Sequence, residues 1–204
     1  WIQEMVQQAA DKAAKPSGSS APTEKVQVGV AKALIKKREE GYPVFSISSD
    51  LPGSTGTAGF QKAFPECVVD VGIAESNMVS MASGLSKQGF IPVVDTFAQF
   101  GVTKGALPLT MASLSGGPVI GIFSHIGASH QSVGYSSMLA SIPNVDLHIL
   151  STSKDAEELV GQAVDHFVES RAKGQTPNSQ IFFLGRENFP HSVMPDGFNY
   201  ELGK

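Results

Sequence analysis

A carboxylate stands at the start of an apolar helix pattern. Glu75 follows a short apolar run at residues 67–70, and it opens a pattern in which Met78, Met81 and Ala82 share one helix face. An acid in the first turn of a helix can stabilise the exposed amides there. Next to apolar side chains, such an acid can also share a proton with a ligand. The pattern around Glu75 by itself favours the first interpretation, and the other strand ends favour the second.

Polar and aromatic residues also follow the other predicted strands. Ligands of open parallel sheets bind outside the carboxyl ends of the strands, so these residues should gather at one edge of the sheet. A purely structural protein has little reason to place acids, histidines and an arginine together there. The residues, in chain order, are Asp50 and Ser54, Glu75, Phe97 and Phe100, His125 and His130, Ser151 and Thr152, and Arg186. The sequence therefore predicts a site at this edge.

Short apolar strands alternating with helices must position these residues. Strands are expected at residues 44–48, 68–71, 90–94, 118–123, 145–150 and 180–184. Helices are expected at about 24–40, 59–63, from Glu75 onward and 95–114, and residues 151–171 are expected to form a loop and then a helix. Thr23 is expected to cap the first helix, and residues 50–56 to form a loop. This alternation predicts an α/β three-layer sandwich, in which helices cover both faces of a six-stranded parallel sheet.

Composition limits the possible partners. The net charge is −4, so no basic surface favours nucleic acid or an anionic membrane. The single cysteine, Cys67, cannot form a disulfide within the chain and indicates a reducing compartment. No apolar run approaches the roughly 20 residues that span a bilayer. We expect a cytoplasmic protein.

The ends of the chain resemble connections to other modules. Residues 1–15 show an amphipathic helix pattern that suits the end of a preceding module, and residues 16–23 are rich in Pro, Ser and Gly, as in a linker. Residues 24–190 form the expected domain, and residues 191–204 are expected to lead towards a C-terminal domain.

Seven phrases, in order, resemble the pyrimidine-binding domain of transketolases. They are residues 48–51 (Ser-Ser-Asp-Leu), 72–78 (Gly-Ile-Ala-Glu-Ser-Asn-Met), 95–100 (Asp-Thr-Phe-Ala-Gln-Phe), 124–125 (Ser-His), 129–131 (Ser-His-Gln), 142–144 (Ile-Pro-Asn) and 185–188 (Gly-Arg-Glu-Asn). The resemblance covers about residues 24–190. It implies the pyrimidine-type thiamine diphosphate-binding fold and transfer of a two-carbon ketol unit between sugar phosphates.

The resemblance implies a role for each cofactor residue. Glu75 matches the catalytic acid that contacts the pyrimidine N1′ of thiamine diphosphate, where a shared proton assists removal of the thiazolium C2 proton. Phe97 and Phe100 match the aromatic wall against which the aminopyrimidine packs. Thr103 stands where the family tends to have a tyrosine, so that wall is altered here.

The resemblance also implies the substrate residues. Ser54, His125 and Arg186 match positions that bind the phosphate of the sugar substrate, and their hydroxyl, imidazole and guanidinium groups suit a phosphate dianion. His130 matches a second active-site histidine, which contacts the substrate near the reacting carbons. Asp50 matches a position near the active-site entrance and the dimer contact.

Two departures affect the substrate half. Only residues 126–129 separate His125 from His130, where transketolases have a longer loop carrying a substrate-binding aspartate. Glu24 stands where the family often has an arginine that helps to bind phosphate. The cofactor half therefore matches the family better than the substrate half does.

The diphosphate-binding part of the family site is not found in the sequence. In transketolases a Gly-Asp-Gly motif followed by Asn holds the diphosphate and its Mg²⁺ or Ca²⁺, and no Gly-Asp-Gly occurs here. The resemblance thus implies a partner module that supplies this half, a homodimer, and a chain inactive alone. Three alternatives stay open: a deoxyxylulose-phosphate synthase, a 2-oxo acid dehydrogenase beta-type chain, or a non-catalytic transketolase-like dimerisation domain.

Overall fold

A parallel sheet of six strands forms the centre of the computed structural model, which describes residues 22–127 and 136–203. Its strands lie in the order β3-β2-β4-β5-β7-β6, and every neighbouring pair runs parallel. They are β2 (Val44–Ser48), β3 (Val68–Asp70), β4 (Ile91–Thr96), β5 (Ile120–Ser124), β6 (Val145–Leu150) and β7 (Ser179–Leu184). The expected α/β architecture with a six-stranded parallel sheet is confirmed.

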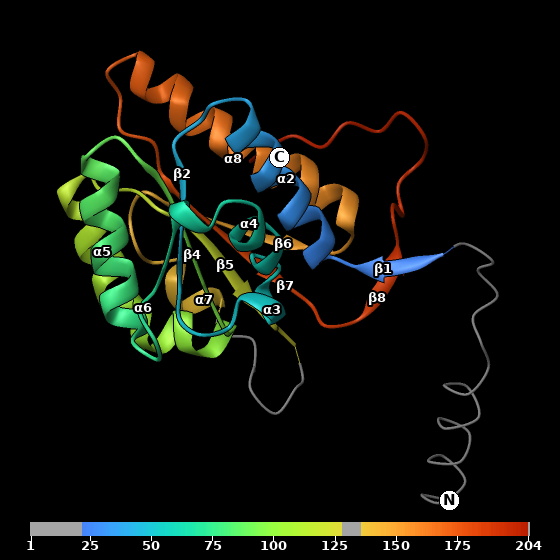
Figure 1. Ribbon diagram of the computed structural model, residues 1–204, viewed down its shortest axis with the longest axis horizontal. Coiled ribbons are helices and arrows are strands. Elements are labelled where there is room, and N and C mark those ends of the chain that lie inside the picture. The colour runs from blue at the N-terminus through green and yellow to red at the C-terminus, as the bar shows by residue number, and fades with distance from the viewer. Residues whose placement is uncertain (1–21, 128–135, 204) are drawn as a thin grey trace, which may run out of the picture.

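Helices cover both faces of this sheet (Figure 1). One layer holds α2 (Gln27–Glu39), α4 (Ala58–Ala63) and α8 (Ser153–Ala172). The opposite layer holds α5 (Glu75–Lys87), α6 (Ala98–Ser115) and α7 (Ser136–Leu139). The short α3 (Pro52–Thr55) and the 3₁₀ turn η1 (Pro65–Cys67) lie in the connections beside the sheet. The chain is thus a three-layer sandwich.

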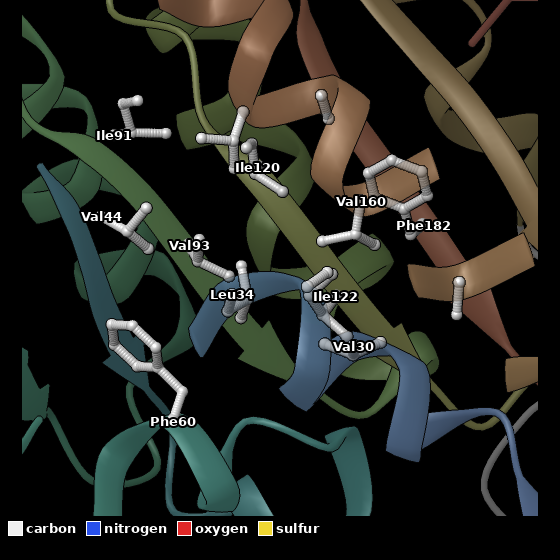
Figure 2. Packing of buried hydrophobic residues seen from close by; sticks show 14 of the residues in the cluster. Val30, Leu34, Val44, Phe60, Ile91, Val93, Ile120, Ile122, Val160 and Phe182 are labelled. Atoms are coloured by element: carbon white, nitrogen blue, oxygen red, sulfur yellow. The ribbon is translucent and has the colours of Figure 1, made fainter. Parts of the chain in front are cut away.

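Two apolar clusters hold the layers together, one on each face of the sheet. Figure 2 shows the first, in which Val30 and Leu34 of α2 and Val160 of α8 pack over Val93 and Ile122 of the central strands. All five residues are fully buried, with 0% of their surface exposed. Each contributes about 1.5–3 kcal/mol by leaving water. Burial on both faces explains why the strands read as continuous apolar runs.

The first expected helix begins later than the sequence pattern indicated, and Thr23 does not cap it. Thr23 begins β1 (Thr23–Lys25), which pairs antiparallel with β8 (Asn188–Pro190). Helix α2 begins at Gln27 after Val26, which forms no side-chain cap. The pairing joins segments far apart in the chain, so a local helix pattern could not reveal it. The helix expected at residues 1–15, and most of the linker, lie outside the described residues.

Two further boundaries differ from the expectation. The stretch 50–56, expected as a loop, contains α3. Asp95 and Thr96 were expected to open a helix, but they extend β4, and α6 begins at Ala98. A carboxylate is unfavourable in a buried strand unless it is hydrogen-bonded, and Asp95 accepts bonds from Ser48 and Thr55. In the described part of the chain, every helix is too short or too polar to cross a lipid bilayer.

Candidate active site

The predicted site residues lie where the strands end. Phe97 follows β4 directly, His125 follows β5 directly, and Arg186 is the second residue after β7. Glu75 comes after the turn that follows β3, and Ser54 lies in α3 after β2. All of these strands are parallel, so their carboxyl ends share one edge of the sheet. His130 and its neighbours lie outside the described residues.

Glu75 is a buried acid without a hydrogen-bond or ion-pair partner among the described residues. It is the first residue of α5, its side chain is 7% exposed, and Ala74 before it offers no side-chain cap. Among the described residues, none forms a hydrogen bond or an ion pair with the Glu75 carboxylate. A carboxylate is costly to bury without a partner. The position is therefore suited to a group that comes from outside the described chain.

The backbone around Glu75 is fixed from both sides. Ser49 Oγ accepts a bond from the Ala74 amide at 3.2 Å and donates to the Gly72 carbonyl at 2.7 Å. Ser76 Oγ donates to the carbonyl of Lys104 in α6 at 2.6 Å. These contacts position the start of α5 without using the carboxylate.

Phe97 and Phe100 form a half-buried aromatic surface. Their ring centroids lie 6.0 Å apart with a 55° angle between the planes. The Phe97 ring also lies 6.0 Å from the His125 ring. Phe97 therefore joins the aromatic surface to the histidine. Thr103, one turn further along α6, is exposed and donates to the Gln99 carbonyl at 2.7 Å.

His125 lies in a hydrogen-bonded network at the end of β5. Its Nδ1 lies 3.0 Å from Ser124 Oγ and 3.3 Å from the Gly185 carbonyl oxygen. Burial lowers the pKa of His125, and repulsion from the Arg186 guanidinium and then the Lys25 ammonium lowers it further, against the bond to Gly185. The imidazole is therefore mainly neutral at pH 7.

The backbone of Ser54, the side chain of His125 and the segment that carries Arg186 lie near one another at the end of β5. The Ser54 carbonyl accepts a hydrogen bond from Ser124 Oγ at 3.0 Å, which holds α3 against the end of β5. Arg186 is exposed, and no described residue pairs with its guanidinium. The side chain of the exposed Asp50, whose φ is 60°, forms no hydrogen bond or ion pair with these residues within the described chain.

Lys25 is a candidate that the sequence interpretation missed. Its ammonium is close enough to affect the pKa of His125, and β1 places it opposite Asn188, two residues after Arg186. Glu24 beside it is occupied elsewhere, because it bonds Ser153 Oγ and lies 2.9 Å from His191 Nδ1. The sequence did contain a signal for Lys25, because this cation stands next to Glu24, the position where the family often has an arginine.

Asp95 is a second buried acid at this edge. Its Oδ2 accepts bonds from Thr55 at 2.7 Å and from Ser48 at 3.0 Å, which tie α3 to the sheet. Burial raises the pKa of Asp95 to about 6, and the hydroxyl bonds oppose that shift. Its residue type and its position in the sequence did not indicate a role at the site.

Comparison with known proteins identifies the family. The sequence profile described as "Transketolase, pyrimidine binding domain" matches residues 25–188. The chain belongs to the transketolase pyrimidine-binding domain family. A solved "Split gene transketolase, inactive beta4 tetramer" is similar to this domain with a TM-score of 0.72 and 26% identity, over 90% of this chain and 58% of that chain.

Curated relatives of this pyrimidine-binding domain carry another enzyme name. The 1-deoxy-D-xylulose-5-phosphate synthase of Dictyoglomus thermophilum is 34% identical over 134 residues, which cover 63% of this chain and 21% of that protein. The enzyme of the same name from Listeria monocytogenes is 28% identical over 162 residues, covering 74% of this chain and 27% of that protein. The domain thus spans about a quarter of the length of these relatives.

Domains of this family belong to thiamine diphosphate enzymes, and the residues present fit the pyrimidine end of that cofactor. Glu75 offers a buried carboxyl group without a partner in the described chain, and Phe97 and Phe100 offer ring faces. An aminopyrimidine ring has a nitrogen for the first and a flat face for the second. No group of three or more His, Cys, Asp or Glu residues in the described ranges could hold a metal ion.

Proposed function

We propose that this domain is the pyrimidine-binding half of a thiamine diphosphate-dependent transketolase, which transfers a two-carbon ketol unit between sugar phosphates. The observation that carries the proposal is Glu75. It is 7% exposed, it is held in place by its backbone neighbours, and its carboxylate has no partner in the described chain.

In the cofactor half, Glu75 holds a proton at the pyrimidine N1′, and Phe97 and Phe100 pack against the ring. The bound cofactor supplies the nucleophilic carbon that the transfer requires. The fixed start of α5 keeps the Glu75 carboxyl group at one place, so the proton is shared along one direction. The aromatic side chains exclude water from that contact and strengthen it.

In the substrate half, Ser54, His125 and Arg186 bind the phosphate of the sugar, with Lys25 beside them. Arg186 and Lys25 carry permanent positive charge and are unpaired in the described chain, as expected for residues that await an anion. We assign His130 to the reacting carbons and Asp50 to the site entrance, following the family pattern. The side chain of Ser54 contributes a hydroxyl donor at the same edge.

A partner supplies the diphosphate half of the site and its Mg²⁺ or Ca²⁺. The similarity to a split-gene transketolase supports a separate subunit. Exposed apolar side chains on this chain also favour one, because Leu107, Met111 and Leu114 of α6 are 73%, 58% and 69% exposed. Spacings of four and three residues place them on one helix face. We also propose a homodimer of such assemblies.

A deoxyxylulose-phosphate synthase is the second candidate. The names of the curated relatives favour it, and the pyrimidine half described above would serve it equally. The two candidates differ in the donor substrate. Assay of the assembled enzyme with each donor separates them.

The role of Glu75 is tested by hydrogen–deuterium exchange at the thiazolium C2 of thiamine diphosphate in the assembled enzyme. Glu75→Gln should slow the exchange by about 100-fold or more, the usual size of an acid–base contribution. Glu169→Gln, an exposed acid on the opposite helix layer, is the control and should exchange like the native protein. Equal rates for Glu75→Gln and the native protein would exclude the proposed role and favour a non-catalytic domain.

A further inference from the structure

Gln27 lies where three segments of the site converge. It is the first residue of α2, and its side chain is 7% exposed. Its Nε2 lies 3.3 Å from the Ser54 carbonyl oxygen, 3.2 Å from Ser124 Oγ and 3.2 Å from the Gly185 carbonyl oxygen. One amide group thus links the segment after β2, the end of β5 and the residue after β7.

Each of these contacts adjoins a candidate phosphate ligand. Ser54 is itself a candidate, Ser124 precedes His125, and Gly185 precedes Arg186. The Gln27 side chain therefore helps to set the separation of the three ligands, together with the Ser124–Ser54 hydrogen bond and the pairing of β5 with β7. Gln27 carries no charge and stands in a helix, so its type and spacing in the sequence do not indicate this role.

The donors and acceptors of the network can be assigned. The carbonyl oxygen of Gly185 only accepts, so a hydrogen bond between it and His125 Nδ1, 3.3 Å away, requires the proton on Nδ1. Ser124 then donates its hydroxyl proton to the Ser54 carbonyl, and its oxygen accepts from His125 Nδ1 and from Gln27 Nε2. The carbonyl oxygens of Ser54 and Gly185 also accept from Gln27, so the side-chain amide must point its nitrogen, rather than its oxygen, toward them.

This assignment determines what His125 presents to a ligand. With the proton on Nδ1, the lone pair of the neutral imidazole lies on Nε2. No described residue forms a hydrogen bond with that nitrogen. It can accept the hydroxyl of a phosphate monoanion, or take up a proton and donate to the dianion.

We infer that Gln27 is a positioning residue of the phosphate site, which holds His125 in its Nδ1–H tautomer and sets the distance between Ser54, His125 and Arg186. The ligand class is a phosphomonoester, and this part of the inference rests on the proposed function. The tautomer of His125 and the spacing of the three residues do not rest on the proposed function, because they follow from contacts within this chain.

The first test measures the tautomer in the full chain by ¹⁵N NMR of the imidazole groups, with His125→Gln to assign the signals. The native protein should show Nδ1–H, and Gln27→Met should show a mixture of tautomers. Gln61→Met is the matched control, because Gln61 of α4 bonds Ser46 Oγ at 3.2 Å, away from His125. Native His125 in the Nε2–H form, or no change in Gln27→Met, would overturn the inference.

Ser124→Ala gives an independent route if Gln27→Met does not fold. It removes the hydroxyl that joins Gln27 to His125, and the small change keeps the packing of β5. The His125 tautomer should shift in the same direction as in Gln27→Met. An unchanged tautomer in Ser124→Ala would count against the inference.

The second test uses the assembled enzyme with a sugar phosphate and with its dephosphorylated analogue. Gln27→Met should raise KM for the phosphorylated substrate about tenfold, because displaced ligand residues would make weaker hydrogen bonds to the charged phosphate, while kcat changes less. KM for the analogue should stay near the native value. An equal rise for both substrates would overturn the phosphate part. If the native enzyme shows no preference for the phosphorylated substrate, the proposed function fails, and the NMR result still decides the tautomer.

Discussion

In the proposed phosphate site, two residues carry permanent positive charge and one histidine is charged only when it is protonated. Burial and the nearby Arg186 and Lys25 cations lower the pKa of His125, so its imidazole is mainly neutral at pH 7. In the proposed site, the positive charge available to a phosphate dianion at pH 7 is therefore mainly that of Arg186 and Lys25. His125 completes the charge only when it takes up a proton.

Arg186→Ala should weaken binding of a phosphorylated substrate. Loss of a charge-assisted contact costs about 1.5–3 kcal/mol, which corresponds to a rise in KM of roughly 10- to 100-fold. Lys25→Met should give a smaller rise, because a lysine ammonium makes no bidentate contact. Steady-state kinetics of the assembled enzyme measures both. Lys32→Met, at a surface ion pair on α2, is the control, and native KM values in all three variants would point to a substrate without phosphate.

Asp95 should make stability depend on pH in a defined window. Its pKa is about 6 in the folded chain, against 3.8 for an ordinary Asp. The folded chain therefore binds more protons than the unfolded one between these values, and the free energy of unfolding falls as pH rises through the window. The change amounts to about 3 kcal/mol, at 1.36 kcal/mol per pH unit.

Asp95→Asn removes this titration and keeps an oxygen that can accept from Ser48 and Thr55. Its stability relative to the native chain should rise as pH increases from about 4 to about 6, and level off above that. Urea unfolding at several pH values measures it. Asp196→Asn, at an exposed acid, should follow the native curve, and a parallel curve for Asp95→Asn would show that Asp95 does not titrate in this window.

At the scale of elements, the contact between α2 and α8 depends on one glycine. A Cβ atom added at Gly29 would lie 1.9 Å from the Ser153 carbonyl oxygen and 2.8 Å from the Glu157 amide nitrogen. Backbone atoms of α8 cannot yield as a side chain would. The two helices approach this closely only because residue 29 has no side chain.

Gly29→Ala should destabilise the fold by about 1–3 kcal/mol, since the helices must move apart. Chemical denaturation measures the loss. Gly84→Ala is the matched control, because a Cβ on that helical glycine of α5 meets nothing within 4 Å. It should be neutral or stabilising by about 0.5–1 kcal/mol. Similar stabilities for the two variants would contradict the steric explanation.

The sequence predicted elements whose signals are local. Apolar runs located all six strands of the sheet, and the position of Glu75 after a strand end indicated the start of α5. The pairing of β1 with β8 was not predictable, because its hydrogen bonds join residues more than 160 positions apart. Asp95 was predicted to lie in a helix and not in β4, because the sequence alone does not show that the hydroxyl groups of Ser48 and Thr55 stabilise a buried acid there.

In the candidate site too, residues with a local sequence signal were predicted, and residues whose role depends on distant contacts were not. Residue types next to strand ends were sufficient to propose Glu75, Phe97, His125 and Arg186. Gln27 was not found, because its role arises only where the ends of three segments meet in space. Lys25 was missed since an unpredicted strand carries it to the site.

At the scale of the whole molecule, α6 presents an uncovered apolar face. Leu107, Met111 and Leu114 are more than half exposed, and Met138 of α7 is 51% exposed. Apolar groups of this extent on a surface mark contacts with other proteins. The proposed diphosphate-binding partner is the occupant that the rest of the site requires.

Leu107→Glu should weaken assembly with that partner by about 100-fold in Kd, as for a central interface residue. The isolated chain should keep its native circular dichroism spectrum, because Leu107 is 73% exposed. Size-exclusion chromatography with light scattering measures the assembly. Val193→Glu, at another exposed apolar residue (61%), is the control. Unchanged assembly of Leu107→Glu would place the interface on a different surface.

The order of the strands also sets the distances between the site residues along the sheet edge. Glu75 follows β3 at one border, and His125 follows β5, three strand positions away. Neighbouring strands lie roughly 4.8 Å apart, so about 14 Å separates the two strand ends. The proposed cofactor acid and the proposed phosphate ligand thus follow different strands of one sheet edge, and Phe97, whose ring lies 6.0 Å from the His125 ring, stands between the two parts of the site.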